Sequence, residues 1–412
     1  MLSKQINLMI KYKQKSFFSL SLLQFLLEPY LYIFIILNIP SLKLIYSSSI
    51  INIAALLGLY FAGFWKHYSY NQLILMNSSK KLFMFLWFVF WLVLFYAGFW
   101  STGSVLSLKL VIRYLIVYFL VIGGLLFTQL EDIKKIINLQ IVWGSLLSIL
   151  LLTVGISLNR ELGQNYLTIG VPIAGSLLAS FGYFLWNKKP NKLFFLIAII
   201  VLNVASLSSL PGRSPILFPV IIIVIYTLYF LYLSIKYKTF SLSKLTNKLI
   251  LIFSIILVSF YIAINTLSDF WLSRFNRMLY SPEEESRIDL YEPSIDAIFK
   301  NPFGYGLNEA EAIIGFYPHN IFLEVFISGG IIAILFLLLI ILVYGFSLNQ
   351  GTQKNLDLFL MSMVTNYFFM VWNISFDLGS SYLPFTGIAI FIAATQDLFK
   401  SKQETLKSNK LK

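Results

Sequence analysis

Apolar stretches long enough to cross a membrane follow one another along almost the whole chain. A run of about 18 or more predominantly apolar residues indicates a transmembrane helix, and hydropathy marks about twelve such runs here. The expected spans are 17–38, 43–64, 82–100, 105–128, 136–157, 166–186, 193–210, 215–235, 248–267, 320–346, 356–376 and 382–400. The runs are continuous rather than alternating, which excludes a transmembrane β-barrel. We therefore expect an all-α polytopic membrane protein, with residues 1–412 forming a single integral membrane domain.

Composition agrees with this fold class. The chain is 58% hydrophobic and 12% charged, with a mean hydropathy of +0.80, whereas a soluble protein is about half apolar and about a quarter charged. It has no cysteine, so disulfides, thiolate nucleophiles and thiolate metal sites are excluded. The basic and then apolar start resembles a signal peptide but has no small-x-small cleavage site, so we expect a retained first span.

The basic residues are divided unevenly between the two sides of the expected membrane. Of the 31 basic residues, 22 lie in the N-terminal tail, in alternate loops or in the C-terminal tail, and all 22 are lysines. By the positive-inside rule this side is the cytoplasm, and both termini lie there, as an even number of spans requires. The net charge of +13 therefore reflects insertion into the cell inner membrane rather than a nucleic-acid partner.

All six arginines lie on the other side, in outer loops or in the outer half of a span: Arg113, Arg160, Arg213, Arg274, Arg277 and Arg287. Lysine is sufficient for topology, whereas the planar guanidinium group can bind phosphate through two hydrogen bonds at once. A genome composition that favours lysine could also produce this division by chance. Because every arginine is away from the lysine side, we favour an anion-binding role for the outer face.

The longest outer segment, 268–319, connects spans nine and ten and carries nine acidic and four basic residues. Within it, "SPEEESRIDLYEPSIDAIFK" begins with Ser281, Pro282 and three acids, a pattern typical of a helix start. Its apolar residues recur on one helical face. We expect an amphipathic helix near the outer membrane surface, ended by "NPFGYGLN".

Three polar features converge on the outer face. Arg213 lies in the tight turn "SSLPGRSP", and Arg287 lies on the expected amphipathic helix. In "YPHN", Pro318 suits the first helical position of span ten, which places His319 in the first turn. The positive end of a helix dipole favours anions and lowers the pKa of a histidine, so that the neutral imidazole can act as a base.

Each of these residues also has a simpler interpretation. His319 could be an interfacial polar residue at the mouth of a helix, and Arg287 could pair with Glu283 or Glu284 at helical spacing. Glu324 lies five residues after His319, about 140° around a regular helix. We therefore expect Glu324 to bond a neighbouring span rather than the histidine.

Further charged residues are candidates for substrate contacts. Lys109 and Arg113 share one face of span four and could bind a lipid diphosphate or pair with Glu28 in span one. Arg160 opens an outer loop and could be another anion contact, or could pair with Glu161.

Aromatic residues make up 17% of the chain, and most of them are expected in interfacial belts. Tyr305 and Tyr317, close to the expected site, are candidates for stacking on sugars. Asp377 is a further outer-face acid and a candidate contact for an acceptor sugar.

Taken together, the outer motifs resemble those of a known family. They are an arginine in "LPGRSP", an arginine early in a large outer loop that ends in "NPFGYGLN", and then "HNIFLEVFISGGIIA". In this combination, residues 200–340 resemble the O-antigen ligase and Wzy-type polysaccharide polymerase superfamily. The turn of that family is often Ser-Arg-Gly, whereas this chain has Gly-Arg-Ser between two prolines.

The resemblance implies a GT-C-like fold and a metal-independent, inverting glycosyl transfer without a cofactor. Donor and acceptor would be undecaprenyl-diphosphate-linked oligosaccharides in the lipid bilayer, with a chain-length regulator as a further partner. Arg213 and Arg287 would neutralise the diphosphate, and His319 would take the proton of the acceptor hydroxyl.

The leading interpretation is therefore a polymerase of O-antigen or capsule polysaccharide. A ligase that transfers finished glycan to lipid A-core needs the same donor site and stays open as an alternative. From a different class, a transporter or flippase would also have about twelve spans. The long outer loop, the one-sided arginines and the absence of paired broken helices in the sequence pattern speak against it.

Overall fold

The computed structural model describes residues 24–42, 48–69, 78–97, 108–155, 166–186, 190–210, 214–237, 288–375 and 377–410, together with the single positions 76, 250, 254 and 261. These residues are predominantly helical, and no strand occurs among them. Seven of the described helices are long and apolar enough to cross a membrane, and three shorter apolar helices accompany them. The predicted all-α polytopic membrane fold is confirmed.

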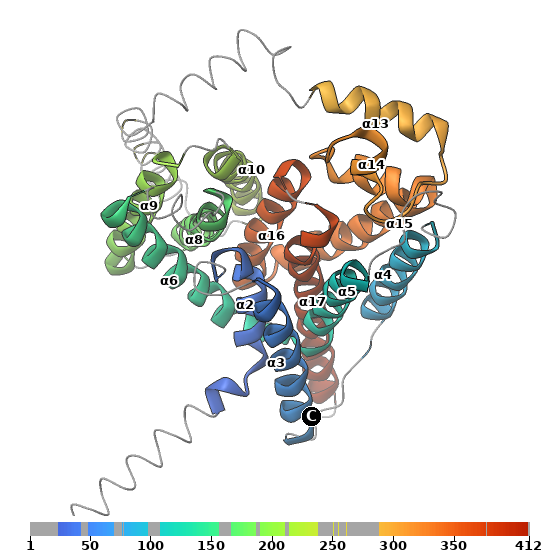
Figure 1. Cartoon of the computed structure of the whole chain (residues 1–412). Helices are drawn as coiled ribbons and strands as arrows, with labels where there is room; N and C mark the ends of the chain where they lie inside the picture. Colours follow the sequence, from blue (N-terminus) through green and yellow to red (C-terminus); the bar gives the residue numbers. More distant parts are fainter. Residues whose placement is uncertain are drawn as a thin grey trace, which may run out of the picture.

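The described helices run in a fixed order along the chain. They are α2 (Pro29–Leu42), α3 (Ser48–Ser69), α4 (Ser78–Ala97), α5 (Leu108–Phe127), α6 (Leu130–Val154), α8 (Tyr166–Trp186), α9 (Pro190–Ser208), α10 (Ser214–Lys236), α13 (Ile288–Lys300), α14 (Ala310–Ile314), α15 (Ile321–Thr352), α16 (Leu356–Ser375), the 3-10 helix η2 (Leu378–Ser380) and α17 (Tyr382–Lys410). Figure 1 shows the long helices gathered as one bundle, whereas α13 and α14 form a small group beside α15, far from the C-terminus.

Most expected spans coincide with these helices within a few residues, but the first one does not. The sequence predicts a span from 17 to 38, of which 17–23 lie outside the described residues. In the part that is described, a turn at Leu27 and Glu28 precedes a helix that starts at Pro29. Proline suits a helix start because it lacks the N–H that would otherwise go unbonded there. The ninth expected span, 248–267, lies outside the described residues apart from its positions 250, 254 and 261.

Helix α8 is the buried centre of one half of the bundle. Of the 18 residues in its most apolar stretch, 94% are buried inside the protein, whereas the corresponding share for α10 is 28%. Helices α6, α9, α10 and α16 pack around α8. The outward side chains of α10 include Val224 and Leu228, which are exposed. Exposed apolar residues of this kind suit contact with lipid rather than water.

Buried polar side chains connect the helices around α8. The hydroxyl of Ser148 on α6 donates to the amide oxygen of Asn203 on α9 at 2.7 Å, and the Asn203 amide donates to Ser176 on α8 at 3.0 Å. Closer to the start of α6, Asn38 of α2 donates to Gln140 at 2.8 Å. Such bonds hold helices together inside a membrane, where an unbonded polar group is costly.

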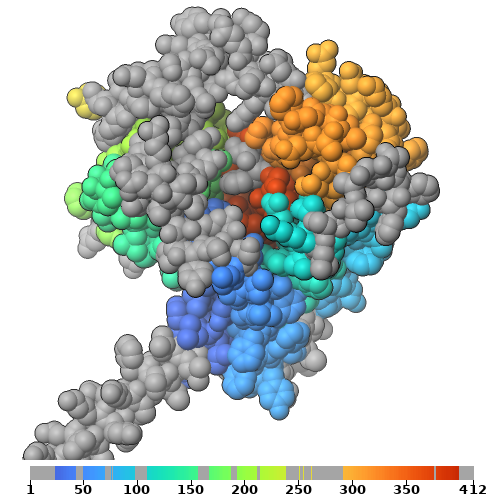
Figure 2. Space-filling model, viewed as in Figure 1, coloured from blue at the N-terminus to red at the C-terminus, as the bar shows by residue number. Residues whose placement is uncertain are grey.

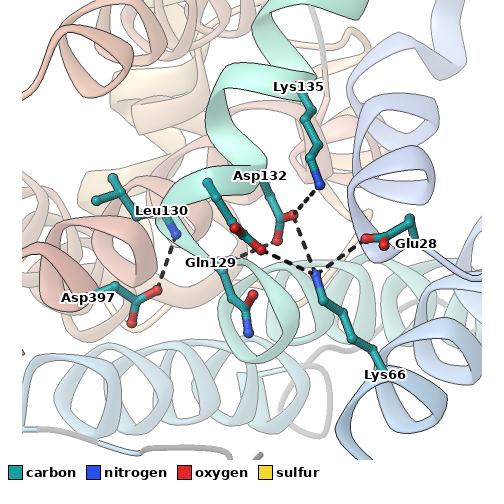
Figure 3. Close-up of polar contacts among 8 residues, drawn as sticks. Glu28, Lys66, Gln129, Leu130, Asp132, Lys135 and Asp397 are labelled. Atoms are coloured by element: carbon teal, nitrogen blue, oxygen red, sulfur yellow. Dashed lines mark hydrogen bonds and ion pairs between the residues drawn. The ribbon is translucent and has the colours of Figure 1, made fainter. Parts of the chain in front are cut away.

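One end of the bundle, called here the Lys66 end, is held by a cluster of charges (Figure 3). The Lys66 ammonium at the end of α3 lies 3.3 Å from Glu28, just before α2, and 3.6 Å from Asp132 in the first turn of α6. The backbone N–H of Leu130 donates to Asp397 of α17 at 3.2 Å. Acids at helix starts and a lysine at a helix end complement the helix dipoles.

The predicted amphipathic helix is present as α13, but its large apolar side chains face outward. Ser294 and Ala297 are buried on the side that packs on α15, whereas Ile295 is 45% and Phe299 80% exposed. Small residues permit the close packing, and the larger ones are left at the surface. This arrangement fits a helix that rests on a membrane surface.

Helix α15 is interrupted at Gly330, where φ is 65° and ψ is −164°. The break removes the helical partners of carbonyl groups one turn earlier. The carbonyl of Ile327 accepts instead from the N–H of Tyr305 at 2.7 Å, and that of Ser328 accepts from Gly306 at 2.8 Å. The motif "NPFGYGLN" thus docks on the broken turn and satisfies its backbone groups, as backbone within a membrane protein requires.

Two glycines make this docking sterically possible. The N–H of Ile331, just after the break, donates to the carbonyl of Pro302 at 2.9 Å. A Cβ atom at Gly330 would overlap Pro302 and Phe303, and one at Gly304 (φ 90°) would lie 2.6 Å from the nitrogen of Gly330. Both glycines have the left-handed backbone that other residues rarely adopt. The contact fixes the loop that precedes His319 against α15.

Candidate active site

His319 lies just outside the helix that it was expected to open. The sequence predicts Pro318 at the first helical position, but α15 begins two residues later, with Asn320 as its N-cap. The Asn320 side-chain oxygen accepts from the N–H groups of Phe322 at 3.0 Å and Leu323 at 3.2 Å. Asparagine is among the best N-cap residues, so this cap sets the helix start. His319 precedes the cap with a left-handed φ of 48°.

The imidazole of His319 packs against the ring of Tyr317. The ring centroids are 4.8 Å apart and the planes meet at 83°, an edge-to-face contact. The Tyr317 hydroxyl in turn donates a hydrogen bond to the carboxylate of Glu324. Burial, and then the charges of Glu324 and Asp377, raise the pKa of Tyr317 well above its ordinary value, so its hydroxyl stays a proton donor in this contact.

Glu324 connects this loop to the short helix η2. Both of its carboxylate oxygens accept the backbone N–H of Leu378, at 3.0 and 3.1 Å, and its side chain is buried. The expected bond to a neighbouring span is therefore a bond to the connection between α16 and α17. Unbonded N–H groups at a helix start readily bind a carboxylate, which explains why Glu324 bonds the first residue of η2.

Arg113 completes the arrangement from α5. Its Nη2 atom lies 2.6 Å from the carboxylate of Asp377, the N-cap residue of η2. The other Asp377 oxygen accepts from the Ser380 hydroxyl at 2.7 Å. The alternative pairing of Arg113 with Glu28 is wrong, because Glu28 lies with Lys66 at the opposite end of the bundle. Figure 2 shows atoms of α5, of α13–α15 and of α16–α17 meeting on one face.

Two further predicted residues lie near this end. Lys109 is exposed at the start of α5, one helical turn before Arg113. Tyr305 lines a cavity of about 370 Å³ together with Glu292, Asp296 and Lys300 of α13. The Tyr305 hydroxyl donates to the carbonyl of Ala297 at 3.0 Å, so its ring is held at the cavity wall.

The predicted anion contacts Arg160, Arg213 and Arg287 lie outside the described residues. Their described neighbours can be placed along the bundle. Helix α6 starts at the Lys66 end and terminates at Val154 at the other, before Arg160 in sequence. Arg287 directly precedes α13 in sequence.

Ser214, which directly follows Arg213 in sequence, belongs to the same end of the bundle as His319. Helices α10 and α15 run in the same direction, because Tyr237 after α10 donates to Gln353 after α15 at 3.0 Å. Both helices therefore start, at Ser214 and at Ile321, toward the opposite end of the bundle. We call this the His319 end.

Sequence reasoning missed the contacts that join these residues. The sequence places both Arg113 and Asp377 at the outer face, and opposite charges at one membrane depth are a signal for a pair. The link from Tyr317 to Glu324 has no such signal, since it depends on the loop conformation before the helix cap. Among the described residues, no three His, Asp or Glu side chains form a metal-binding group.

Comparison with known families places this site in context. Residues 212–338 match the family model Wzy_C, described as O-antigen ligase. The predicted resemblance is thereby confirmed over this segment, and the match supports a membrane enzyme that processes glycans. No curated protein and no solved structure matches the chain. Arg113 and Asp377 lie outside the matched segment.

Proposed function

We propose that this protein is a polysaccharide polymerase that transfers a polyprenyl-diphosphate-linked glycan onto a lipid-linked repeat unit, with His319 as the general base. One observation carries the proposal: His319 lies beside the start of α15, inside the segment that matches the O-antigen ligase family. The starts of α10 and α5 lie at the same end of the bundle. His319, Lys109 and Ser214, which follows Arg213 in sequence, therefore belong to the same end of the bundle.

The proposed reaction needs positioning and charge stabilisation. The acceptor hydroxyl oxygen attacks the anomeric carbon of the donor, while the bond from that carbon to the diphosphate oxygen breaks. His319 takes the proton of the acceptor hydroxyl, and the polyprenyl diphosphate leaves with the electron pair. Attack opposite the leaving group inverts the anomeric centre. A diphosphate is already a good leaving group, so oriented cations suffice to assist its departure.

The cations divide into two groups in this proposal. Arg213 and Arg287 neutralise the diphosphate through bidentate hydrogen bonds, and Arg160 and Lys109 add further positive charge. Arg113 bonds Asp377 through Nη2, and its side chain is 43% exposed. Since a guanidinium group has five N–H donors, Arg113 can bind Asp377 and an anion together.

The cavity beside α13 supports a sugar contact at Tyr305. Its wall combines this aromatic ring with two carboxylates, Glu292 and Asp296, and with Lys300. Carboxylates accept from sugar hydroxyls, and an aromatic ring packs on the apolar face of a sugar. Tyr317 and Asp377, the other two candidates for sugar contacts, are bonded to Glu324 and to Arg113, so each would contact a sugar while it keeps that bond.

The ligase is the second candidate, and the family description favours it directly, since it reads O-antigen ligase. A ligase would use the same donor and the same base but a different acceptor, lipid A-core. The distinction therefore depends on the acceptor and not on the residues around His319.

One experiment separates these functions. The full chain is reconstituted in lipid vesicles with a synthetic polyprenyl-diphosphate oligosaccharide, with and without added lipid A-core. Longer lipid-linked glycans support the polymerase, and transfer only to lipid A-core supports the ligase. If the lipid-linked oligosaccharide moves between the leaflets without any glycosyl transfer, the proposal that the protein is an enzyme is contradicted.

The two histidines of the chain give matched variants for this assay. His319→Ala should abolish transfer, whereas His67→Ala should leave it unchanged, because His67 lies in the last turn of α3 at the Lys66 end. Full activity in the His319→Ala variant would remove this residue as the base.

A further inference from the structure

His319, which must hold its side chain in one orientation to act as a base, has an unusual backbone conformation. Its φ of 48° is left-handed, and among the described non-glycine residues only Asn308 shares this property. The residue precedes the N-cap and so lies outside α15. A base has to meet its proton within hydrogen-bond reach. The orientation of the imidazole must therefore depend on contacts made by its side chain.

Tyr317 provides such a contact. Its ring meets the imidazole edge to face at 4.8 Å between centroids, a geometry that aromatic pairs prefer. Tyr317 lies in the same loop, however, and would move together with His319 if nothing held it. Its hydroxyl is held, because it donates to Glu324.

Glu324 is a suitable anchor because it lies on a rigid element and is itself bonded twice. It belongs to the first turns of α15, is 7% exposed, and accepts the N–H of Leu378 at 3.0 and 3.1 Å. The Arg113–Asp377 pair holds η2, which provides that N–H. A buried carboxylic acid in a membrane span is expensive, and such residues are usually functional.

We propose that Tyr317 and Glu324 are positioning residues that orient the imidazole of His319 for proton transfer. The inference rests on the proposed function, in which His319 is the base. Glu324 acts as a hydrogen-bond acceptor for both the Tyr317 hydroxyl and the Leu378 N–H. The order of contacts runs from α15 through the tyrosine to the histidine, so each member depends on the one before it.

The kinetic test uses variants that remove one contact at a time. Tyr317→Phe keeps the ring and loses the hydroxyl, and Glu324→Leu loses the acceptor. Both should lower kcat by about tenfold or more with donor KM nearly unchanged, since positioning is a share of the about 10²–10⁴ that a general base contributes. Glu324→Gln keeps an acceptor for Leu378 and a polar partner for Tyr317, and should restore most of the activity.

Coupling between the variants distinguishes positioning from general damage. If the two residues act in one sequence of contacts, the double variant with Tyr317→Phe and Glu324→Leu should be no slower than Glu324→Leu alone. If the double variant loses as much kcat as the two single losses multiplied together, the inference is overturned. It is also overturned, in favour of a structural role, if all variants lose kcat, donor binding and thermal stability equally.

A spectroscopic test is independent of activity. The chain has only two histidines, so labelling histidine rings with ¹⁵N and ¹³C gives two imidazole signals. Tyr317→Leu should shift the His319 signal, because a neighbouring ring current is lost, and should leave His67 as the internal control. An unchanged His319 signal would overturn the inference.

The two proposals can fail separately. If the wild-type chain transfers no glycan while the His319 signal still responds to Tyr317, the proposed function fails and the contact stands. If His319→Ala is inactive but Tyr317→Phe and Glu324→Leu keep wild-type kcat, only the positioning role fails.

Discussion

The Arg113 guanidinium on α5 lies 2.6 Å from the carboxylate of Asp377, a residue 264 positions later in the chain. This pair joins two helices of the first and last thirds of the sequence at the His319 end. Asp377 is also the N-cap residue of η2, and the N–H group of Leu378 in η2 donates to Glu324. The pair is therefore a part of the frame around His319 and not an isolated surface contact.

Removing Arg113 should loosen this frame. Arg113→Ala should lower stability by about 1–2 kcal/mol, between the about 0–1 of exposed pairs and the about 3–5 of buried ones, since the two side chains are 43% and 33% exposed. Thermal unfolding in detergent measures this loss. Combined with Asp377→Asn, the double variant should be more stable than the two separate losses predict, and strict additivity would contradict the pairing.

The docking of "NPFGYGLN" on α15 gives a second prediction. Gly330→Ala should prevent or strongly reduce folding, because a left-handed residue costs about 1–2 kcal/mol and the added Cβ would also overlap Pro302. Gly345→Ala is the matched control in the same helix, where nothing lies within 4 Å of the new Cβ. The yield of folded protein after purification reports both. Equal yields would show that the break at Gly330 is not required.

The charge cluster at the Lys66 end gives a third prediction. Lys66→Met keeps the aliphatic stem but leaves Asp132 buried with Lys135 at 4.0 Å as its remaining cation. Breaking a buried pair costs about 3–5 kcal/mol, so the unfolding temperature should fall clearly. Lys134→Met, an exposed lysine in the first turns of α6, should have little effect. A similar fall in both variants would contradict a specific role of Lys66.

The proposed binding of diphosphate gives a fourth prediction. Arg213→Lys keeps the positive charge but loses the planar guanidinium group that can bind phosphate through two hydrogen bonds. The value of kcat/KM for the lipid-linked donor should therefore fall by about 10- to 100-fold, which is less than the fall of about 10²–10³ when an oxyanion-hole donor is removed entirely. Lys134→Arg, at the Lys66 end, serves as the control for a lysine–arginine exchange. Wild-type kinetics in Arg213→Lys would exclude a bidentate role for Arg213.

The helices themselves were predictable because membrane spans are local. Each span needs about 20 apolar residues, and that information lies within one stretch of sequence; α8 matches its prediction of 166–186 to the residue. The family resemblance was predictable for a related reason, since its motifs lie within one continuous stretch of sequence that overlaps the matched residues 212–338. The first span was mispredicted because hydropathy continues through Leu27 and Glu28 while the backbone turns there.

The contacts of the candidate site were not predictable because they are not local. Arg113 and Asp377 meet only once α5 and the start of η2 are packed together. At the start of α15, Pro318 and Asn320 offered two competing helix signals, and the two hydrogen bonds of the asparagine cap decided the boundary. That two-residue difference places His319 outside the helix and against Tyr317.

The orientation in the membrane gives a last prediction, which the absence of cysteine makes simple to test. The proposed site faces outward, so Glu311→Cys, at an exposed position of α14, should react with a membrane-impermeant maleimide added to intact cells. Ser69→Cys, at the exposed end of α3 beside Lys66, should react only after the membrane is permeabilised. The reverse pattern would put His319 on the cytoplasmic side, where a lipid-linked glycan that has already crossed the membrane could not reach it.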